Sequence, residues 1–202
     1  MASTNWDERY RTGDLPWDTN RHDKNLEEII AQHSIEPCAV LELGCGTGTN
    51  AVWLAERGFC VTALDVSPVA IEMARERVSR EGSAAEFIAA DVLADEIPGA
   101  PFAFVFDRGC FHSFHEPADR DAFANTVWSC LADGGLWLSL IGSADGPELE
   151  VGPPRESVRE ISTVVEPFFE IISIRVTHFD SDLPEPPRAW ECFMRKRDAV
   201  QA

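Results

Sequence analysis

A glycine-rich segment constrains this chain more than any other feature of its sequence. Residues 41–48 read Leu-Glu-Leu-Gly-Cys-Gly-Thr-Gly and join an apolar run at 39–43 to a stretch with helical character. Gly44, Gly46 and Gly48 carry no Cβ atom, so the chain can turn sharply between strand and helix and a ligand can lie against its backbone. The segment therefore predicts a ligand site at the carboxyl end of a first parallel strand.

A carboxylate follows at the spacing expected for ribose binding. Asp65 ends the next apolar run, 21 residues beyond Gly44. An acid at the end of the second strand meets a ribose diol at an offset of about 20 residues. The glycines and Asp65 together place a nucleoside at the carboxyl ends of two adjacent parallel strands, and we include the next residue, Val66, in the predicted site.

The rest of the chain alternates short apolar runs with helical patterns, which is typical of a parallel sheet covered by helices. Strands are expected at 39–43, 61–64, 86–89, 103–107 and 136–141, with helices at 50–57, 68–80, 119–131 and near 156–165. Two further strands, at 168–177 and 190–194, leave no room for a crossover helix and must be antiparallel. The predicted fold class is α/β: a Rossmann-like, seven-stranded, mostly parallel sheet with helices on both faces and a C-terminal antiparallel strand pair.

Residues 1–202 are expected to form a single domain, since this length can bury a substantial core without a second unit. Residues 1–35 are expected to form an aromatic arm and a helix, near 23–33, that cover the site. A Gly/Pro-rich loop at 142–154 has the length and composition of a lid, or of an ordinary connection.

Composition argues against several classes of function. The formal net charge of −18 opposes binding to a polyanionic backbone, so no nucleic-acid partner is expected. No apolar run approaches the roughly 20 residues of a membrane helix, and the polar start does not resemble a signal peptide. We therefore expect a cytoplasmic protein without a membrane partner, and leave the oligomeric state open.

Neither a metal site nor a redox motif is expected. Six cysteines lie far apart without a Cys-x-x-Cys pair, which favours buried, reduced thiols. Asp65, Asp91 and Asp107 each follow a different strand, and no cluster of histidines and carboxylates accompanies them. For Cys45 and Cys110, packing is favoured over covalent chemistry because no base is spaced to activate them.

Three features favour S-adenosylmethionine over a dinucleotide as the bound nucleoside. The glycines follow Gly-x-Gly-x-Gly, whereas a pyrophosphate site uses Gly-x-Gly-x-x-Gly. Glu42 would lie badly beside a diphosphate but can orient the loop or attract the amino group of a methionine moiety. Asp91, followed by Val92, comes directly after the third strand, where its carboxylate can accept a hydrogen bond from an adenine amine.

These segments resemble the class I S-adenosylmethionine-dependent methyltransferases. Residues 42–48 match the glycine motif of that superfamily, Asp65 its ribose acid and residues 90–92 its adenine motif. The resemblance covers nearly the whole chain. It implies S-adenosyl-L-methionine as the cofactor, S-adenosyl-L-homocysteine as its product, and a seventh strand inserted beside the fifth.

Segments outside this core resemble the thiopurine, thiol and halide methyltransferase group, which includes tellurite-resistance enzymes. They are Trp6, Tyr10, Gly13, Trp17 and residues 107–109, 119–120, 152–154 and 190–197. In that group the N-terminal aromatics fold over cofactor and acceptor, which implies the same for the three aromatic residues of the arm. The resemblance also places Arg108 beside cofactor and substrate, with Asp107 at the cofactor. The complete glycine motif is closer to the halide and general small-molecule branches than to mammalian thiopurine enzymes.

Arg108 and His112 are the candidate catalytic residues. Arg108 follows the fourth strand at the ligand-binding edge, where its charge could stabilise an anionic acceptor; alternatively, it pairs with Asp107 to anchor the loop. His112 titrates near neutrality and could accept a thiol proton, although a structural loop histidine is the favoured alternative. The resemblance implies that Arg120 reaches the acceptor pocket, but a solvated side chain paired with a neighbouring aspartate is favoured.

The predicted function is methyl transfer from S-adenosylmethionine to a small molecule, with a thiol, halide or related chalcogen compound as the leading acceptor. Transfer from a sulfonium is accelerated mainly by positioning and removal of water, and a thiol must also be held as its thiolate. The alternatives are an O- or N-methyltransferase of a small metabolite, an NAD-dependent dehydrogenase, and a non-catalytic nucleoside-binding protein.

Overall fold

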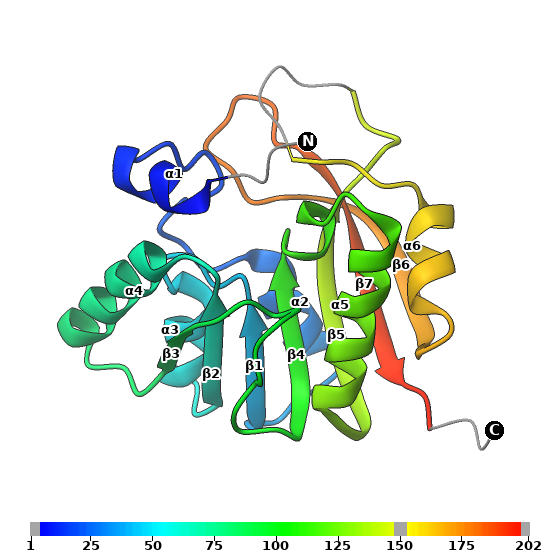
Figure 1. The fold of residues 1–202 in the computed structure, drawn as a ribbon, viewed down its shortest axis with the longest axis horizontal. Helices are drawn as coiled ribbons and strands as arrows, with labels where there is room; N and C mark the ends of the chain where they lie inside the picture. The colour runs from blue at the N-terminus through cyan, green and yellow to red at the C-terminus, as the bar shows by residue number, and fades with distance from the viewer. Residues whose placement is uncertain (1–4, 148–152, 199–202) are drawn as a thin grey trace.

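The computed structural model describes residues 5–147 and 153–198, in which a seven-stranded sheet is covered by helices (Figure 1). The strands are β1 (Ala39–Leu43), β2 (Cys60–Asp65), β3 (Glu86–Ala89), β4 (Phe102–Arg108), β5 (Leu131–Gly142), β6 (Phe169–His178) and β7 (Arg188–Lys196). Their order in the sheet is β3-β2-β1-β4-β5-β7-β6. Strands β1 to β5 pair in parallel and β7 runs antiparallel to both β5 and β6. The predicted fold class is confirmed, including the last strand inserted beside the fifth.

The helices are α1 (Trp6–Thr12), α2 (Lys24–Gln32), α3 (Thr49–Glu56), α4 (Pro68–Glu81), α5 (Pro117–Cys130) and α6 (Val158–Val165), with a 3-10 turn, η1 (Phe111–Ser113). Asp23 caps α2 and Ser67 caps α4, each by accepting a backbone N–H of the first turn. Helix α5 starts two residues earlier than predicted because Pro117 occupies its first turn, where a missing N–H costs nothing.

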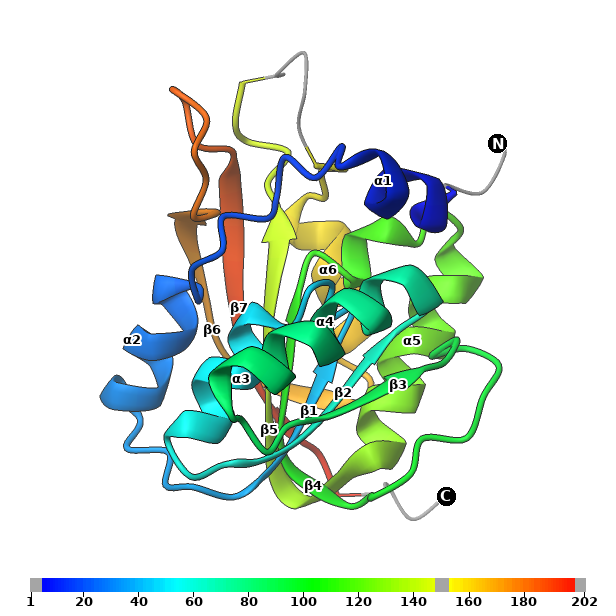
Figure 2. The same cartoon turned by 90° about the vertical axis from the view of Figure 1, so that its left-hand side faces the viewer.

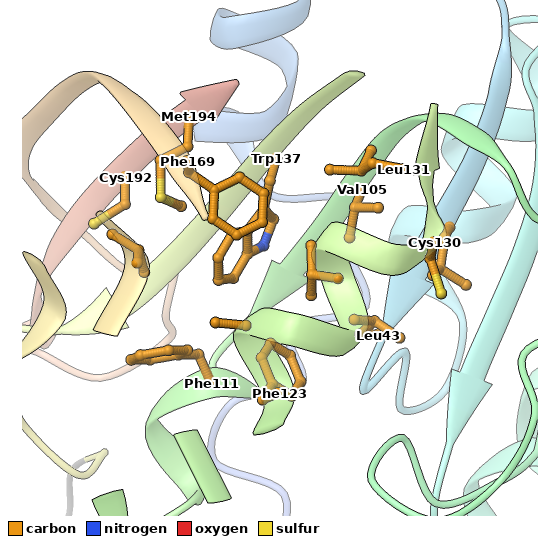
Figure 3. Packing of buried hydrophobic residues seen from close by; sticks show 14 of the residues in the cluster. Leu43, Val105, Phe111, Phe123, Cys130, Leu131, Trp137, Phe169, Cys192 and Met194 are labelled. Carbon is orange, nitrogen blue, oxygen red and sulfur yellow. The ribbon is translucent and has the colours of Figure 1, made fainter. Parts of the chain in front are cut away.

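Two apolar layers cover the two faces of the sheet. Side chains of α2, α3 and α4 pack in one cluster, and those of α5 and α6 pack in the other, so the helices divide between the faces (Figure 2). In the second cluster, Trp137 of β5 is fully buried among Phe111, Phe123 and Phe169 (Figure 3). The same cluster includes Val105 of β4, so it supports both β4 and β5 beneath the loops that follow them.

The structure also bears on the predictions about cysteines, membrane helices, metal sites and the loop after β5. The six cysteines are free, but Cys60 is exposed, so the prediction of buried thiols fails for that residue because it begins an accessible end of β2. No helix within 5–147 and 153–198 is long and apolar enough to cross a membrane. In the same ranges, no group of three His, Cys, Asp or Glu residues is arranged to hold a metal ion. Residues 148–152 of the predicted lid, and Gly152 of the family resemblance, lie outside the described residues.

Candidate functional site

The glycine loop between β1 and α3 is built from left-handed backbone. Gly44, Gly46 and Gly48 have φ angles of 66°, 55° and 80°, which side chains with a Cβ rarely adopt. A Cβ at Gly46 would lie 3.0 Å from the hydroxyl oxygen of Tyr10. The N-terminal arm therefore lies directly against the glycine loop, and Tyr10 can approach this closely because Gly46 has no side chain.

Asp65 holds this loop to the end of β2. Its Oδ2 accepts the Gly46 N–H at 2.9 Å and its Oδ1 accepts the Ser67 N–H at 2.9 Å. Burial raises the pKa of Asp65, while these two hydrogen bonds oppose that rise. A carboxylate oxygen can accept two hydrogen bonds, so each oxygen of Asp65 keeps one acceptor position, which matches a pair of ribose hydroxyls.

Glu42, at the end of β1, has one carboxylate oxygen without a partner. Oε1 accepts Asn50 Nδ2 at 3.2 Å, whereas the buried Oε2 accepts no hydrogen bond. Burial raises the pKa of Glu42 to about 8. An unpaired buried carboxylate oxygen is costly, and a cationic group is the ligand that would offset that cost. This atom fits the amino group of the predicted cofactor.

Asp91 and Val66 supply the features expected around a nucleobase. Asp91 follows β3, is exposed, and uses Oδ1 to accept the Leu93 N–H at 2.9 Å. Val66 follows β2 and leaves 51% of its surface exposed, whereas Val92 is buried. An exposed apolar side chain after β2 and an exposed carboxylate after the neighbouring strand β3 suit a flat ring with a hydrogen-bonding edge. The residues present therefore fit the adenosine part of the predicted cofactor.

The structure brings the three aromatic residues of the arm together. The ring centroids of Trp6 and Trp17 are 5.7 Å apart, and those of Tyr10 and Trp17 are 6.2 Å apart. Tyr10 is buried, which raises the pKa of its hydroxyl well above the usual value. Helix α1 lies at the edge of the sheet toward which the parallel strands run (Figures 1 and 2). The cluster is thus placed over the glycine loop.

Polar contacts that sequence reasoning missed fasten the arm to the core. Arg77 of α4 donates to the Thr47 carbonyl oxygen at 2.9 Å and to Asn20 Oδ1 at 2.8 Å. Thr47 Oγ1 donates to Asp18 Oδ2 at 2.8 Å. These partners are far apart in sequence, so no local pattern signals their meeting. Grooves of about 530 Å³ and 360 Å³ flank this contact, and none of the predicted cofactor residues lines either.

Arg108 holds three segments together. Its Nε donates to Asp23 Oδ2 at 2.6 Å, and its other nitrogens donate to the carbonyl oxygens of Trp17 at 3.1 Å and Asp180 at 2.6 Å. The predicted alternative, a pair with Asp107, is wrong, because the partner is the buried cap of α2. Every guanidinium nitrogen is committed to a contact within the protein, which favours a structural role over direct contact with an acceptor.

Asp107 lies beneath the site. It is completely buried, and its two oxygens accept the Phe111 N–H at 3.1 Å and Trp137 Nε1–H at 2.9 Å. Burial raises its pKa to about 6, although these hydrogen bonds favour the ionised form. The carboxylate therefore fixes η1 against the core and acts on the site through the position of that turn.

His112 is held as a neutral imidazole. Its Nδ1 accepts the Gly142 N–H at 2.8 Å, which leaves the ring proton on Nε2. Burial, aided by the nearby charge of Arg108, lowers its pKa to about 3. The basic nitrogen is thus occupied and the ring does not titrate near neutrality. This geometry favours the structural alternative over the predicted general base.

Replacing His112 with glutamine should make unfolding less sensitive to acid. Below pH 6.5 the unfolded chain protonates this imidazole, whereas the folded protein does so only near pH 3. The free energy of unfolding therefore decreases as the pH is lowered through that window, by up to about 1.4 kcal/mol per pH unit. His112→Gln keeps an acceptor for Gly142 but removes the titration. Urea unfolding at pH 7, 6, 5 and 4 measures the difference, and equal slopes for both proteins would contradict the buried neutral ring.

The partner of Arg120 also differs from the prediction. The predicted solvated side chain, paired with a neighbouring aspartate, is instead an ion pair with Glu156, and both side chains are nearly buried. Arg120 Nε has no hydrogen-bond partner. Glu156 also pairs through its backbone with Gly142 and Ala144. The pair ties the start of α5 to the described end of the loop after β5.

The chain is similar to several known proteins. Residues 40–135 match a family model described as a methyltransferase domain. The chain is 31% identical to "Probable thiol methyltransferase 2" of Arabidopsis thaliana, covering 93% of this chain and 81% of that protein. It is 28% identical to "Thiocyanate methyltransferase 1" of Brassica oleracea, covering 84% of this chain and 75% of that protein. A solved structure titled "Conversion of a Disulfide Bond into a Thioacetal Group during Echinomycin Biosynthesis" superposes with a TM-score of 0.85 at 25% identity, over 100% of this chain and 94% of that one.

Proposed function

Because this chain belongs to the S-adenosylmethionine-dependent methyltransferases, we propose that it methylates a small acceptor whose nucleophile is a thiolate or a comparably soft anion. One observation carries the choice of acceptor. Asp107, near the end of β4, and His112, in the turn that follows, are both committed to hydrogen bonds within the protein. An acceptor that arrives already ionised needs neither of them as a base.

The chemistry of the acceptor decides between sulfur and oxygen. A free thiol has a pKa of about 8.5, so part of it is thiolate at neutral pH. Thiocyanate and iodide carry a reactive electron pair without losing a proton. An alcohol must lose a proton to a base during the reaction. The names of the two plant relatives, a thiol and a thiocyanate methyltransferase, support the same acceptor class.

The residues of the chain act by binding, orientation and exclusion of water. When bound, the cofactor supplies a methyl group already activated on a sulfonium. We assign its ribose to Asp65, its adenine to Asp91 and Val66, and its amino group to Glu42. The aromatic cluster of the arm forms an apolar cover, which removes water from an in-line displacement and places electron-rich rings near a cation.

The same proposal includes the setting of the enzyme. We propose that residues 1–202 act as one methyltransferase domain in the cytoplasm. The formal net charge of −18 supports a small-molecule acceptor over a nucleic acid.

A labelled-methyl assay tests the acceptor class. The panel contains two thiols of different acidity, iodide, thiocyanate, selenite, a phenol and an amine. We expect the soft nucleophiles to react at least tenfold faster than the phenol and the amine. For the two thiols, the midpoint of the pH–rate profile should shift with the pKa of each thiol, since the thiolate is the reacting form.

The other outcomes are distinct. A pH midpoint that stays fixed when the thiol changes identifies an enzyme base and overturns the proposal. Preference for the phenol or the amine identifies an O- or N-methyltransferase. Binding of S-adenosylhomocysteine without turnover of any acceptor identifies a protein that binds the cofactor but lacks activity toward this class.

A further inference from the structure

A buried polar chain runs from the orphaned carboxylate of Glu42 to the N-terminal arm through Asn50. Asn50 lies in the first turn of α3, and only 9% of its surface is exposed. Its Nδ2 donates to Glu42 Oε1 at 3.2 Å, and its Oδ1 accepts the Asp23 N–H at 2.8 Å. One partner is an acceptor and the other a donor, so the two contacts fix the orientation of the amide.

The chain continues from Asp23 to both segments that close over the sheet edge. The Asp23 carboxylate, only 1% exposed, caps α2 and accepts Arg108 Nε. Arg108 in turn donates to the backbone of Trp17, in the arm, and of Asp180, between β6 and β7. Three further hydrogen bonds, from Asp23 to Asn50, from Arg108 to Asp23 and from Arg108 to Trp17, therefore connect the contact at Glu42 to the end of the aromatic cluster.

The surroundings of Glu42 make its charge sensitive to a ligand. From β2, the negative charge of Asp65 disfavours its ionised form, while Arg108 of β4 favours it. From α3, Asn50 and the backbone N–H of Ala51 also favour the ionised form. Burial outweighs these contributions and raises the Glu42 pKa to about 8, so a cation brought to the partnerless Oε2 favours the carboxylate.

We propose that Asn50 is a positioning residue that couples occupation of the cofactor's amino-acid end at Glu42 to the seating of the N-terminal arm. This rests on the assignment of Glu42 under the proposed function. An ionised Glu42 is a stronger acceptor for Asn50 Nδ2, because charge-assisted hydrogen bonds are stronger than neutral ones. The better-held amide then fixes its Oδ1 on Asp23. Coupling is reciprocal, so loosening this link must also weaken cofactor binding.

Asn50→Asp tests the link with the least change in shape. The new side chain keeps an acceptor for the Asp23 N–H but turns a carboxylate oxygen toward Glu42. Asn20→Asp is the matched control, since it adds the same charge at an exposed arm position and keeps the acceptor for Arg77. Calorimetry measures the Kd for S-adenosylhomocysteine, and hydrogen exchange measures protection of the α1 amides with and without that compound.

We expect saturating S-adenosylhomocysteine to slow exchange of the α1 amides at least tenfold in the parent and in Asn20→Asp. In Asn50→Asp, the Kd should rise at least tenfold and saturation should slow exchange less than threefold. A weakened Kd with parental protection at saturation overturns the coupling, as does a variant that behaves like the parent. If Asn50→Asp does not fold, Asn50→Ala, which removes both contacts without adding charge, is judged by the same criteria.

Glu42→Gln separates this inference from its premise. A parental Kd for S-adenosylhomocysteine in that variant removes the assignment of Glu42, and with it the coupling. The acceptor panel is measured independently on the parent protein, so failure of the proposed acceptor class leaves this result unaffected.

Discussion

Arg108→Met should destabilise the protein by about 3–5 kcal/mol, because it leaves the carboxylate of Asp23 buried without its cationic partner. The substitution also removes the donors to the carbonyl oxygens of Trp17 and Asp180. We expect the N-terminal arm to detach from the core and its backbone amides to exchange faster with solvent. Urea unfolding measures the loss of stability, and hydrogen exchange of residues 6–21 measures the exposure of the arm amides.

Two further variants make this prediction specific. Arg195→Met breaks an ion pair with Glu170 whose side chains are about half exposed, so it should cost less than about 1 kcal/mol. Adding Asp23→Asn to Arg108→Met removes the unpaired charge and should recover part of the loss. If Arg108 instead serves mainly to hold an anionic acceptor, Arg108→Met will raise the acceptor KM while leaving stability and the arm unchanged.

Gly48→Ala should lower the free energy of unfolding by about 3 kcal/mol, the sum of a left-handed backbone penalty and an overpacked core. Gly48 has a φ of 80°, and a Cβ there would lie 2.6 Å from Cζ of Phe87, with the Cβ of Ala74 at 3.0 Å. Both neighbours are buried, so neither can move away cheaply. Chemical denaturation of the parent and the variant measures the loss.

Gly82→Ala is the matched control for the core contribution. Gly82 also has a left-handed φ, 69°, but nothing lies within 4 Å of the position of a new Cβ. Its cost should be the backbone penalty alone, about 1 kcal/mol. If the two variants lose equal stability, the close packing of Gly48 against β3 and α4 is refuted. The expected result assigns Gly48, predicted as a cofactor contact, to the packing of the loop.

The predictions that depend on local patterns agree with the structure. Alternating apolar runs and helical stretches are properties of neighbouring residues, so the strands and their mostly parallel pairing could be inferred, while the family resemblance supplied the insertion of the last strand beside the fifth. Residues 41–48 and Asp65 indicated the nucleoside site because its spacing follows from one strand, one turn and the next strand. The methyltransferase assignment is confirmed by the family to which the chain belongs.

Local sequence patterns predicted the partners of individual polar side chains less well. Arg108 was expected to meet either Asp107 or an acceptor, and it meets Asp23, 85 residues away in sequence. Arg120 was expected to pair locally and it pairs with Glu156. A long cationic side chain reaches any carboxylate that folding brings within its length, and sequence distance does not limit that choice.

The layered sheet, the glycine turn and the acid that follows it could all be predicted from the amino-acid sequence, since each depends on residues adjacent in the chain or on one repeated spacing. The tautomer of His112, the partners of Arg108 and the bridge through Asn50 became visible only in the folded chain. Those properties depend on burial and on which distant donor meets which acceptor. Both are set when the arm, the sheet edge and the loop between β6 and β7 pack together.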